Sequence, residues 1–415
     1  MGASRGVATV AGMTDETTTP SSNDTDGRAG SALEVLLAFI PLGFTAFGGP
    51  VAHLGYFRTA FVERRRWLSD HAYADLVALC QFLPGPASSQ VGMALGLRRA
   101  GVPGLFAAWA AFTLPSAIAM AAFGILLSAT GVNEGAGWIW GLKAAAAAVV
   151  AHALLGMAHS LAGTRERAAI AGIATVIMLV SPNPLFAQLG VIAAGAVAGL
   201  MLRDVDTPEA GDTIPIRVSP ALGIAALVCF FAAFIVLPLL GTLSAPFDLF
   251  DRFYRVGALV FGGGHVVLPM LQGEMQGYVE PSEFLAGYGV AQAVPGPLFT
   301  FASFLGAVST PFGGVGGAIV ATVAIFLPSV LLLIGVMPFW ERVRRVRVAR
   351  RMLAGVNAAV VGLLGAAFYD PVFTEGVRGP DALALVVVAF VALRHYQAPP
   401  WAVVVASGAI GWVAL

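Results

Sequence analysis

The sequence predicts an all-α polytopic membrane protein made of two inverted-topology repeats with broken or re-entrant helices and about 9–11 spans. Three observations predict this fold class: the scarcity of charge, a duplicated set of glycine and proline motifs, and loops of opposite charge in the two halves. Of the 415 residues, 58% are hydrophobic and 11% are charged. Because a soluble domain carries about 25% charged residues, the composition excludes one.

The composition also excludes several classes of function. A net charge of zero without a long basic run argues against a nucleic-acid binder. Lys143 is the only lysine, so the chain has no phosphate-binding loop with a Gly-Lys pair and no visible nucleotide hydrolysis. Cys80 and Cys229 lie in apolar stretches and are expected to be buried small hydrophobes. With no cluster of metal ligands and no Ser, His and acid trio, we expect no catalytic residue, no metal and no cofactor.

The chain divides into segments by composition. Residues 1–30 are rich in Ser, Thr, Asp and Gly, which predicts a disordered tail. A first transporter repeat is expected at 31–202, a polar linker at 203–218, a connecting span at 219–241 and a second, inverted repeat at 248–415. Uncharged apolar runs predict spans at 103–129, 138–161, 168–181, 184–202, 219–241, 312–338, 352–369, 380–393 and 398–415.

Four motifs recur in the same order in the two halves. Phe47-Gly48-Gly49-Pro50 is matched by Phe261-Gly262-Gly263-Gly264, and the Pro-Gly-Pro of 84–86 by that of 295–297. Leu-Pro-Ser at 114–116 recurs at 327–329, and the apolar run from Gly141 recurs from Gly355. Four matches in order at a separation of 211 to 214 positions indicate an internal duplication.

Charges in the matched loops set the relative orientation of the repeats. The loop at 58–66 is basic, whereas its counterpart at 272–283 carries only glutamates. Conversely, 130–137 carries one glutamate, whereas 340–351 carries six arginines. Basic loops stay in the cytoplasm, so the two halves should have opposite topology, as in many secondary transporters.

One path satisfies these charges. The N-terminus is cytoplasmic, 31–66 and 70–100 dip into the membrane as hairpins, and four crossings return the chain to the cytoplasm. The unpaired span 219–241 then inverts the second copy, whose hairpins enter from outside. In the alternative path the first segment of each half crosses fully, and the sequence leaves both open.

The motif breaks are the expected binding site. Glycine permits a tight turn and proline starts a helix, so each break exposes unpaired N–H groups and a positive helix end, which bind anions. The alternative is that the breaks only kink packed helices, but their recurrence in both copies favours anion binding. The candidate substrate-binding residues are Gly48, Gly49, Gln81, Pro84, Gly85, Pro86, Ser88 and Ser89 in the first repeat, and Gly262, Gly263, His265, Gln292, Pro295, Gly296, Pro297 and Thr300 in the second.

Other polar residues in apolar surroundings are weaker candidates. His53 and His265 follow the Gly-Gly breaks and either donate to an anion or serve structure. His152 and His159 lie on one helix face, and we expect them to form hydrogen bonds to neighbouring helices. Lys143 lies near the end of its span, where it is expected to reach the interface.

The motifs resemble those of the chromate ion transporter family in its long, two-domain form. The resemblance is carried by FGGPVAHLGYF at 47–57, QFLPGPASSQVGMALG at 81–96, FGGGHVVLPML at 261–271 and VPGPLFTFASFLGA at 294–307. It covers the chain from about residue 32 to 415, with Gly264 where the first copy has Pro50. The resemblance implies a bacterial inner-membrane protein that expels chromate and confers resistance, with sulfate as the related oxyanion.

The expected function is therefore export of a tetrahedral oxyanion by a secondary transporter, driven by membrane potential or an ion gradient. Partners are chromate, sulfate as a second candidate, and the lipid bilayer, without nucleic acid; a homodimer is left open. The alternatives are a carrier of sulfate or another oxyanion and, remotely, a membrane-embedded enzyme. Apart from Asp381 at the start of the span 380–393, no carboxylate lies inside a predicted span, which disfavours the enzyme.

Overall fold

The computed structural model describes residues 30–130, 136–181, 184–202, 218–261, 267–343 and 346–414. Within these ranges the chain is helical, apart from turns and one isolated bridge between Gln276 and Val279. Residues 1–29 of the predicted tail and 203–217 of the predicted linker lie outside the described residues. The all-α fold class is confirmed.

The first half begins with short helices and continues with long ones. Ser31, Ser69 and Thr164 cap the helices that follow them, because each side chain accepts a backbone N–H of the first turn. The elements are α1 (Ala32–Thr45), α2 (Gly49–Phe57), the π-helix η2 (Arg58–Arg64), α3 (Asp70–Phe82), α4 (Ala87–Thr130), α5 (Gly137–Leu161), α6 (Arg165–Val180) and α7 (Pro184–Gly199).

The longest helix, α4, is two helices joined at a kink. Ala100 and Gly101 have non-helical backbone angles, and Gly101 has a φ of 64° that favours glycine. The kink falls at the predicted boundary between the hairpin that ends near residue 100 and the span 103–129. Arg99 beside it pairs with Glu34 at 2.9 Å, which ties the kink to the start of α1.

The second half follows one additional helix. That helix is α8 (Pro220–Gly241), which lies within the range 219–241, whose role as a connecting span stays a prediction. The elements that follow are α9 (Ala245–Leu259), α10 (Val267–Met275), α11 (Pro281–Ala293), η4 (Leu298–Thr300), α12 (Phe301–Val308), α13 (Gly314–Val336), η5 (Met337–Phe339), α14 (Trp340–Val343), α15 (Arg347–Ala367), η6 (Phe368–Phe373), α16 (Thr374–Gly376), α17 (Pro380–Arg394) and α18 (Pro400–Ala414).

Several helices have the length and composition of membrane spans. Among the described residues five qualify: Ala87–Thr130, Gly137–Leu161, Pro220–Gly241, Gly314–Phe339 and Arg347–Gly376. Shorter apolar helices, including α1, α18 and parts of α3 and α7, accompany them. The chain is therefore a multi-pass membrane protein, and the total of about 9–11 spans stays a prediction.

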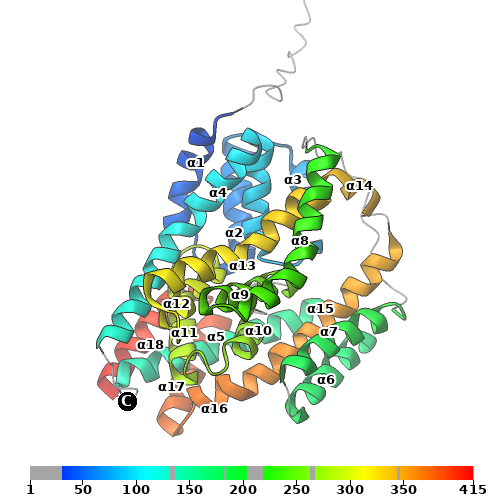
Figure 1. Cartoon of the computed structure of the whole chain (residues 1–415). Helices are drawn as coiled ribbons and strands as arrows, with labels where there is room; N and C mark the ends of the chain where they lie inside the picture. Colours follow the sequence, from blue (N-terminus) through cyan, green and yellow to red (C-terminus); the bar gives the residue numbers. More distant parts are fainter. Residues whose placement is uncertain are drawn as a thin grey trace, which may run out of the picture.

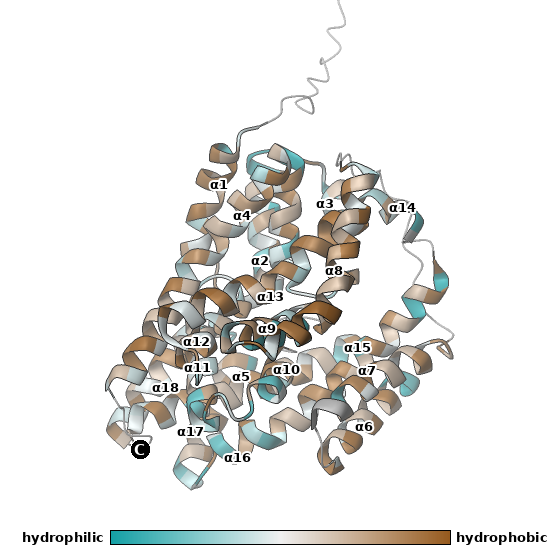
Figure 2. Cartoon of the chain, viewed as in Figure 1, coloured by the Kyte–Doolittle hydropathy of each residue, from teal (hydrophilic) through white to brown (hydrophobic). Residues whose placement is uncertain are grey.

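The outer helices present apolar side chains to their surroundings. On α8, Val228, Phe231 and Ile235 are more than half exposed. Figure 2 shows α8 in brown along most of its length, whereas hydrophilic residues gather near α14 at one end of the molecule and near α16 and α17 at the other. A large exposed apolar surface needs a nonpolar partner, and lipid is the one that a span such as α8 requires.

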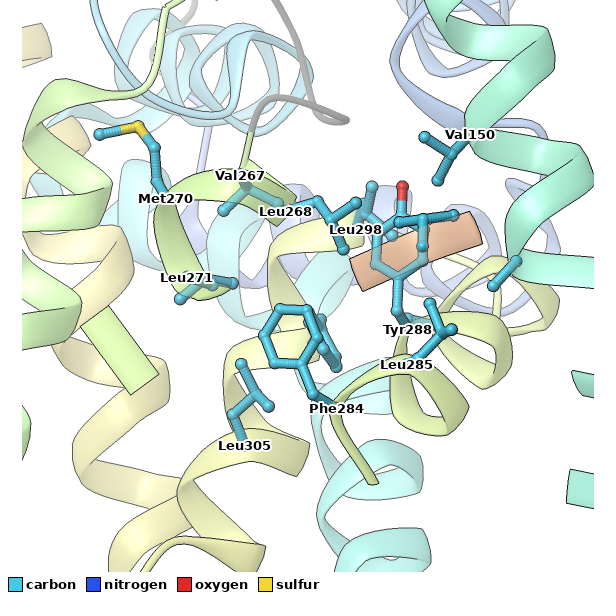
Figure 3. Close-up of a cluster of buried hydrophobic side chains, with 14 of the residues drawn as sticks. Val150, Val267, Leu268, Met270, Leu271, Phe284, Leu285, Tyr288, Leu298 and Leu305 are labelled. Atoms are coloured by element: carbon cyan, nitrogen blue, oxygen red, sulfur yellow. The ribbon is translucent and has the colours of Figure 1, made fainter. Parts of the chain in front are cut away.

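The interior is packed around α5, α13 and α15. The stretch Ala144–Ala148 of α5 is fully buried, and its small side chains let neighbouring backbones approach closely. Figure 1 shows α5 surrounded by α11, α15 and α18. Figure 3 shows Phe284, Leu285 and Tyr288 of α11 turned toward other members of the same buried apolar cluster, which includes Val150 of α5. A rigid apolar centre of this kind holds the interrupted helices in place.

Close backbone contacts recur at matching positions of the two halves. A Cβ on Gly43 would collide with the carbonyl oxygen of Ala111, and a Cβ on Gly257 would collide with that of Ile325. Both residues of the second pair lie 214 positions after those of the first. Consequently α1 packs on α4 in the same way that α9 packs on α13.

The last two helices of each half pack on the opposite half. Gly355 of α15 lies against the backbone of Gly195 in α7, and Gly141 of α5 lies against that of Ser407 in α18. Likewise α6 packs on α15, and α17 packs on α5. Each half therefore contributes a terminal hairpin to the other, which locks the halves together.

The matched glycine contacts predict matched losses of stability. Gly43→Val and Gly257→Val should each destabilise the protein by about 1–3 kcal/mol, because the new side chain overlaps a backbone carbonyl. The measurement is the thermal midpoint of purified protein in detergent. Gly172→Val is the control, because a Cβ there meets no atom within 4 Å. Equal midpoints for the three variants would contradict the packing.

Candidate functional site

A cavity of about 660 Å³ lies where the interrupted helices of the two halves meet. Its wall includes residues of both Pro-Gly-Pro breaks and of the first Gly-Gly break. The predicted site residues that line it are Gly48, Gly49, Gln81, Gly85, Gln292 and Gly296. Motifs more than 200 positions apart in the sequence therefore line one cavity.

Each Pro-Gly-Pro break depends on its glycine. Gly85 has a φ of 117° and Gly296 a φ of 98°, in the left-handed region where other residues are strained. The first break lies between the end of α3 at Phe82 and the start of α4 at Ala87. The second lies between the end of α11 at Ala293 and η4. The chain thus stops one helix and starts another within a few residues.

The two breaks are held by hydrogen bonds that cross between the halves. The N–H of Gly85 donates to the carbonyl of Val260 at the end of α9, with an N···O distance of 2.6 Å. The N–H of Gly296 donates to the carbonyl of Ala46 at the end of α1, at 2.9 Å. Since Ala46 and Val260 lie 214 positions apart, the same contact is made twice in opposite directions.

The serines of the two Leu-Pro-Ser motifs also cross. A Cβ on Gly85 would collide with Oγ of Ser329 in the second half. A Cβ on Gly296 would lie 2.8 Å from Oγ of Ser116 in the first half. Ser116 and Ser329 are both fully buried. These positions recurred in the sequence because each one packs on the break of the other half.

Helix starts face the cavity from both halves. Ala87, the first residue of α4, and Leu298, the first of η4, both line it. The N–H groups of a first helical turn have no partner within the helix, and the helix dipole makes that end positive. Because both helix starts line the same cavity, their N–H groups would favour an anion there.

The first Gly-Gly break is fixed by a histidine. Nε2 of His53 lies 3.1 Å from the carbonyl of Ala46, and Nδ1 lies 3.2 Å from Oγ of Ser88. A carbonyl only accepts, so Nε2 carries the proton and Nδ1 accepts from the Ser88 hydroxyl. His53 is buried and joins the end of α1 to the start of α4. These contacts favour a structural role for His53 over donation to an anion, the two roles that the sequence left open.

The remaining predicted residues that the structure describes do not line the cavity. Ser88 is turned to His53, and the hydroxyl of Thr300 donates back to the carbonyl of Pro297 at 2.8 Å. Ser89 is buried within α4. Pro84, Pro86, Pro295 and Pro297 lie within the two breaks, between the helices that each break separates. Gly262, Gly263 and His265 lie outside the described residues.

The sequence reasoning missed one wall of the cavity. It is a face of α5 with helical spacing, made of Val149, His152, Ala153, Gly156, Met157 and Ser160. The sequence predicts that His152 bonds a neighbouring helix, but His152 lines the cavity. His159 does not line it. The alternation of small and polar residues every three or four positions was the available signal.

Three polar atoms of residues that line the cavity lack partners. Nδ1 of His152, Nε2 of Gln292 and Oδ1 of Asn357 have no hydrogen bond within the described part of the chain. Asn357 comes from α15 and occupies the position that matches Lys143 of α5. Buried polar atoms are normally satisfied, so a site with free donors and acceptors suits a polar ligand.

A second cavity, of about 570 Å³, is lined by residues of α10, α11 and α15 and by no residue of the Pro-Gly-Pro breaks. Its wall contains Leu363, Ala366 and Ala367 of α15, which match Val149, His152 and Ala153 in the first cavity. The two cavities thus use equivalent faces of α5 and α15. In place of the first cavity's histidine, the second contains carboxylates, from Glu280, Asp370 and Glu375.

The arrangement suits noncovalent anion binding. The described ranges hold no group of three His, Cys, Asp or Glu that could ligate a metal ion. The neutral donors of helix starts, amides and an imidazole can bind an oxyanion and release it again.

Comparisons with known proteins agree with this description. The family model described as "Chromate transporter" matches residues 33–200 and again 247–412. The chain is 28% identical over 396 residues to the "Chromate transport protein" of Pseudomonas aeruginosa, covering 92% of each chain. It is 26% identical over 388 residues to the "Chromate transport protein" of Cupriavidus metallidurans, again covering 92% of each. The "Probable chromate transport protein" of Synechococcus elongatus is 29% identical over 339 residues, covering 79% of this chain and 81% of its own. No solved structure matches significantly.

The crossed packing at the breaks predicts a selective rescue. Gly85→Ala should destabilise the protein, and Ser329→Ala should recover part of the loss by removing the colliding hydroxyl. The recovered part is expected to be about 0.5–3 kcal/mol, as for residues in contact. The backbone strain at positive φ, about 1–2 kcal/mol, stays. Thermal unfolding of the single and double variants measures both.

Ser116→Ala is the matched control for this rescue. Ser116 packs on Gly296 instead, so its truncation should leave the Gly85→Ala loss unchanged. Equal rescue by the two serine variants would contradict the crossed arrangement.

Proposed function

The chain belongs to the chromate transporter family, a family of transporters and not of enzymes, and on that premise we propose that it exports chromate across the bacterial inner membrane. Export by a secondary transporter would give resistance to chromate. The observation that carries the proposal is the single cavity onto which helix starts from both halves converge. Chromate is a tetrahedral dianion, and such helix ends bind dianions.

The proposed binding site has the chemistry of a carrier. The dianion would accept hydrogen bonds from the N–H groups after Pro86 and Pro297 and from the amides of Gln81 and Gln292. Gly262, Gly263 and His265 remain proposed members of the second-half wall. Because the donors are neutral, the site can release its substrate, which transport requires. Sulfate has the same shape and charge and is the expected competitor.

We infer that the halves are inverted repeats. The support is the set of matched contacts: α1 on α4 and α9 on α13, the two crossed hydrogen bonds, and the exchanged terminal hairpins. The charged loops add independent support, since the arginine-rich loop 340–351 of the second half matches a nearly neutral loop in the first. The connecting helix α8 would invert the second copy.

This topology assigns the two cavities to opposite sides of the membrane. If the arginine-rich loop is cytoplasmic, α15 runs outward and its far half lines the second cavity, which is then external. α5 runs inward, and its last turns line the first cavity, which is then internal. The structure would therefore be an inward-facing state. Exchange of the two conformations between the repeats would open the other side.

The membrane potential favours export. Each charge that crosses 100 mV of potential is worth about 2.3 kcal/mol. An exiting dianion therefore gains roughly 4 to 5 kcal/mol in an inside-negative cell, which is about three orders of magnitude in concentration ratio. Export needs no coupled ion, whereas accumulation inside would need one.

Removal of the paired amides tests the site. Gln81→Leu and Gln292→Leu should each lower chromate uptake into inverted membrane vesicles about tenfold or more, because a hydrogen bond to a charged ligand is worth about 1.5–3 kcal/mol. Thr242→Val, an exposed position at the end of α8, is the control for loss of a polar group. Wild-type uptake by both glutamine variants, at equal protein levels, would rule out the proposed site. Competition by sulfate and other oxyanions measures selectivity.

The energy source can be tested with purified protein. In proteoliposomes with the potential clamped, the chromate flux should rise as the side that contains chromate becomes more negative. It should be the same with and without a pH gradient. A flux that follows the pH gradient at zero potential would instead indicate proton coupling and overturn the uniport mechanism.

A further inference from the structure

The main cavity opens to the outside of the protein through a mouth between α2, α5 and the α17–α18 hairpin. This mouth is a further hollow, of about 500 Å³, distinct from the second cavity described above. It shares the lining residues Gly48, His152, Leu393 and Pro400 with the main cavity. The two spaces therefore adjoin, and we interpret this hollow as the mouth of the main cavity. The remaining wall of the mouth includes Arg394 and Gln397 from the tip of the hairpin.

Arg394 is the cation of this mouth. It ends α17, an otherwise apolar helix whose only other charged residue is Asp381 in the first turn. Arg394 is exposed, and His152 of α5 lines the same hollow. Among the described residues that line the mouth, none is an aspartate or a glutamate.

Arg394 is one of the arginines that form no ion pair in the described part of the chain, whereas several others do. Arg99 pairs with Glu34, Arg252 with Asp248, and Arg378 with Glu375. Within the described ranges no carboxylate lies at ion-pair distance from Arg394. An arginine at the end of an apolar helix needs water or an anion nearby, because lipid alone would not solvate it.

The opposite cavity has the opposite charge. The described residues that line it include Glu280, Asp370 and Glu375 but no lysine, arginine or histidine. Glu375 is neutralised by Arg378 at 2.9 Å, which leaves Glu280 and Asp370 as the carboxylates without a basic partner on that wall. A dianion would thus be attracted at one entrance and repelled at the other.

We propose that Arg394, with His152 behind it, forms an anion-capture site at the mouth, which draws a tetrahedral dianion from bulk water into the cavity. The inference rests on the proposed function and deepens it. The site holds the dianion by charge and passes it to the neutral donors at the helix starts, where Arg394 does not reach. Arg394 therefore sets the affinity for entry and leaves the later transport steps unchanged.

Flux in proteoliposomes of known orientation tests the proposal. Arg394→Gln should raise the chromate KM about tenfold at low ionic strength, the lower end of the range for electrostatic steering. The maximal rate should stay within about twofold, because the transported state does not involve the arginine. Arg394→Lys should restore the wild-type KM, since it keeps the charge. The KM of the wild type should rise with salt, and that of Arg394→Gln should rise much less.

Arg165→Gln is the matched control. Arg165 is an exposed arginine at a helix end that lines neither cavity, so its loss should leave the KM unchanged. Thermal unfolding is measured in parallel, because Arg394 at the carboxyl end of α17 also complements the helix dipole. A lower thermal midpoint with an unchanged KM would assign Arg394 that structural role and overturn the capture site.

Equilibrium dialysis of chromate against purified protein separates the two proposals. If the wild type transports chromate and Arg394→Gln has the same KM and the same salt dependence, the capture site is wrong and the proposed function stands. If the wild type transports no chromate, the proposed function fails. In that case equal chromate binding by the wild type and Arg394→Gln also overturns the capture site, and weaker binding by the variant supports it.

Discussion

The arrangement of the broken helices and of the cavity between them depends on two backbone hydrogen bonds. A broken helix inside a membrane leaves N–H and C=O groups that lipid cannot satisfy. Here the N–H of Gly85 bonds the carbonyl of Val260, and that of Gly296 bonds the carbonyl of Ala46. Each half therefore completes the backbone of the other. The N–H groups of the following helix starts stay directed at the cavity.

These crossed contacts explain why the two halves pack as a single unit. The terminal hairpins pack on the opposite half, so neither half could keep its breaks in place alone. Glycines at the crossings allow backbones to touch, and α5 and α15 supply equivalent faces to the two cavities. The two cavities use equivalent helix faces, whereas the charges on their walls differ. We interpret that difference as favouring capture of the dianion from one side, while the membrane potential sets the direction of net transport.

Much of this arrangement could be predicted from the sequence. The repeat separation pairs Gly85 with Gly296 and Ser116 with Ser329, and each glycine lies against the serine of the other half. The hydroxyls of Ser88 and Thr300 could not be placed, since their orientation depends on His53 and on a local turn. The cavity wall formed by α5 was not predicted, because an alanine-rich run by itself indicates only close helix packing. The position of Arg394 at the cavity mouth could not be predicted, because basic residues are common at helix ends and the sequence does not show the cavity beside this one.

The central claim is that the two Pro-Gly-Pro breaks together bind the oxyanion. Chromium scatters anomalously, so a structure determined with bound chromate locates the dianion directly. The account predicts a chromium peak in the main cavity between Gly85 and Gly296, within hydrogen-bond reach of the helix starts. A peak elsewhere in a saturated protein, with the space between the breaks empty, would contradict it.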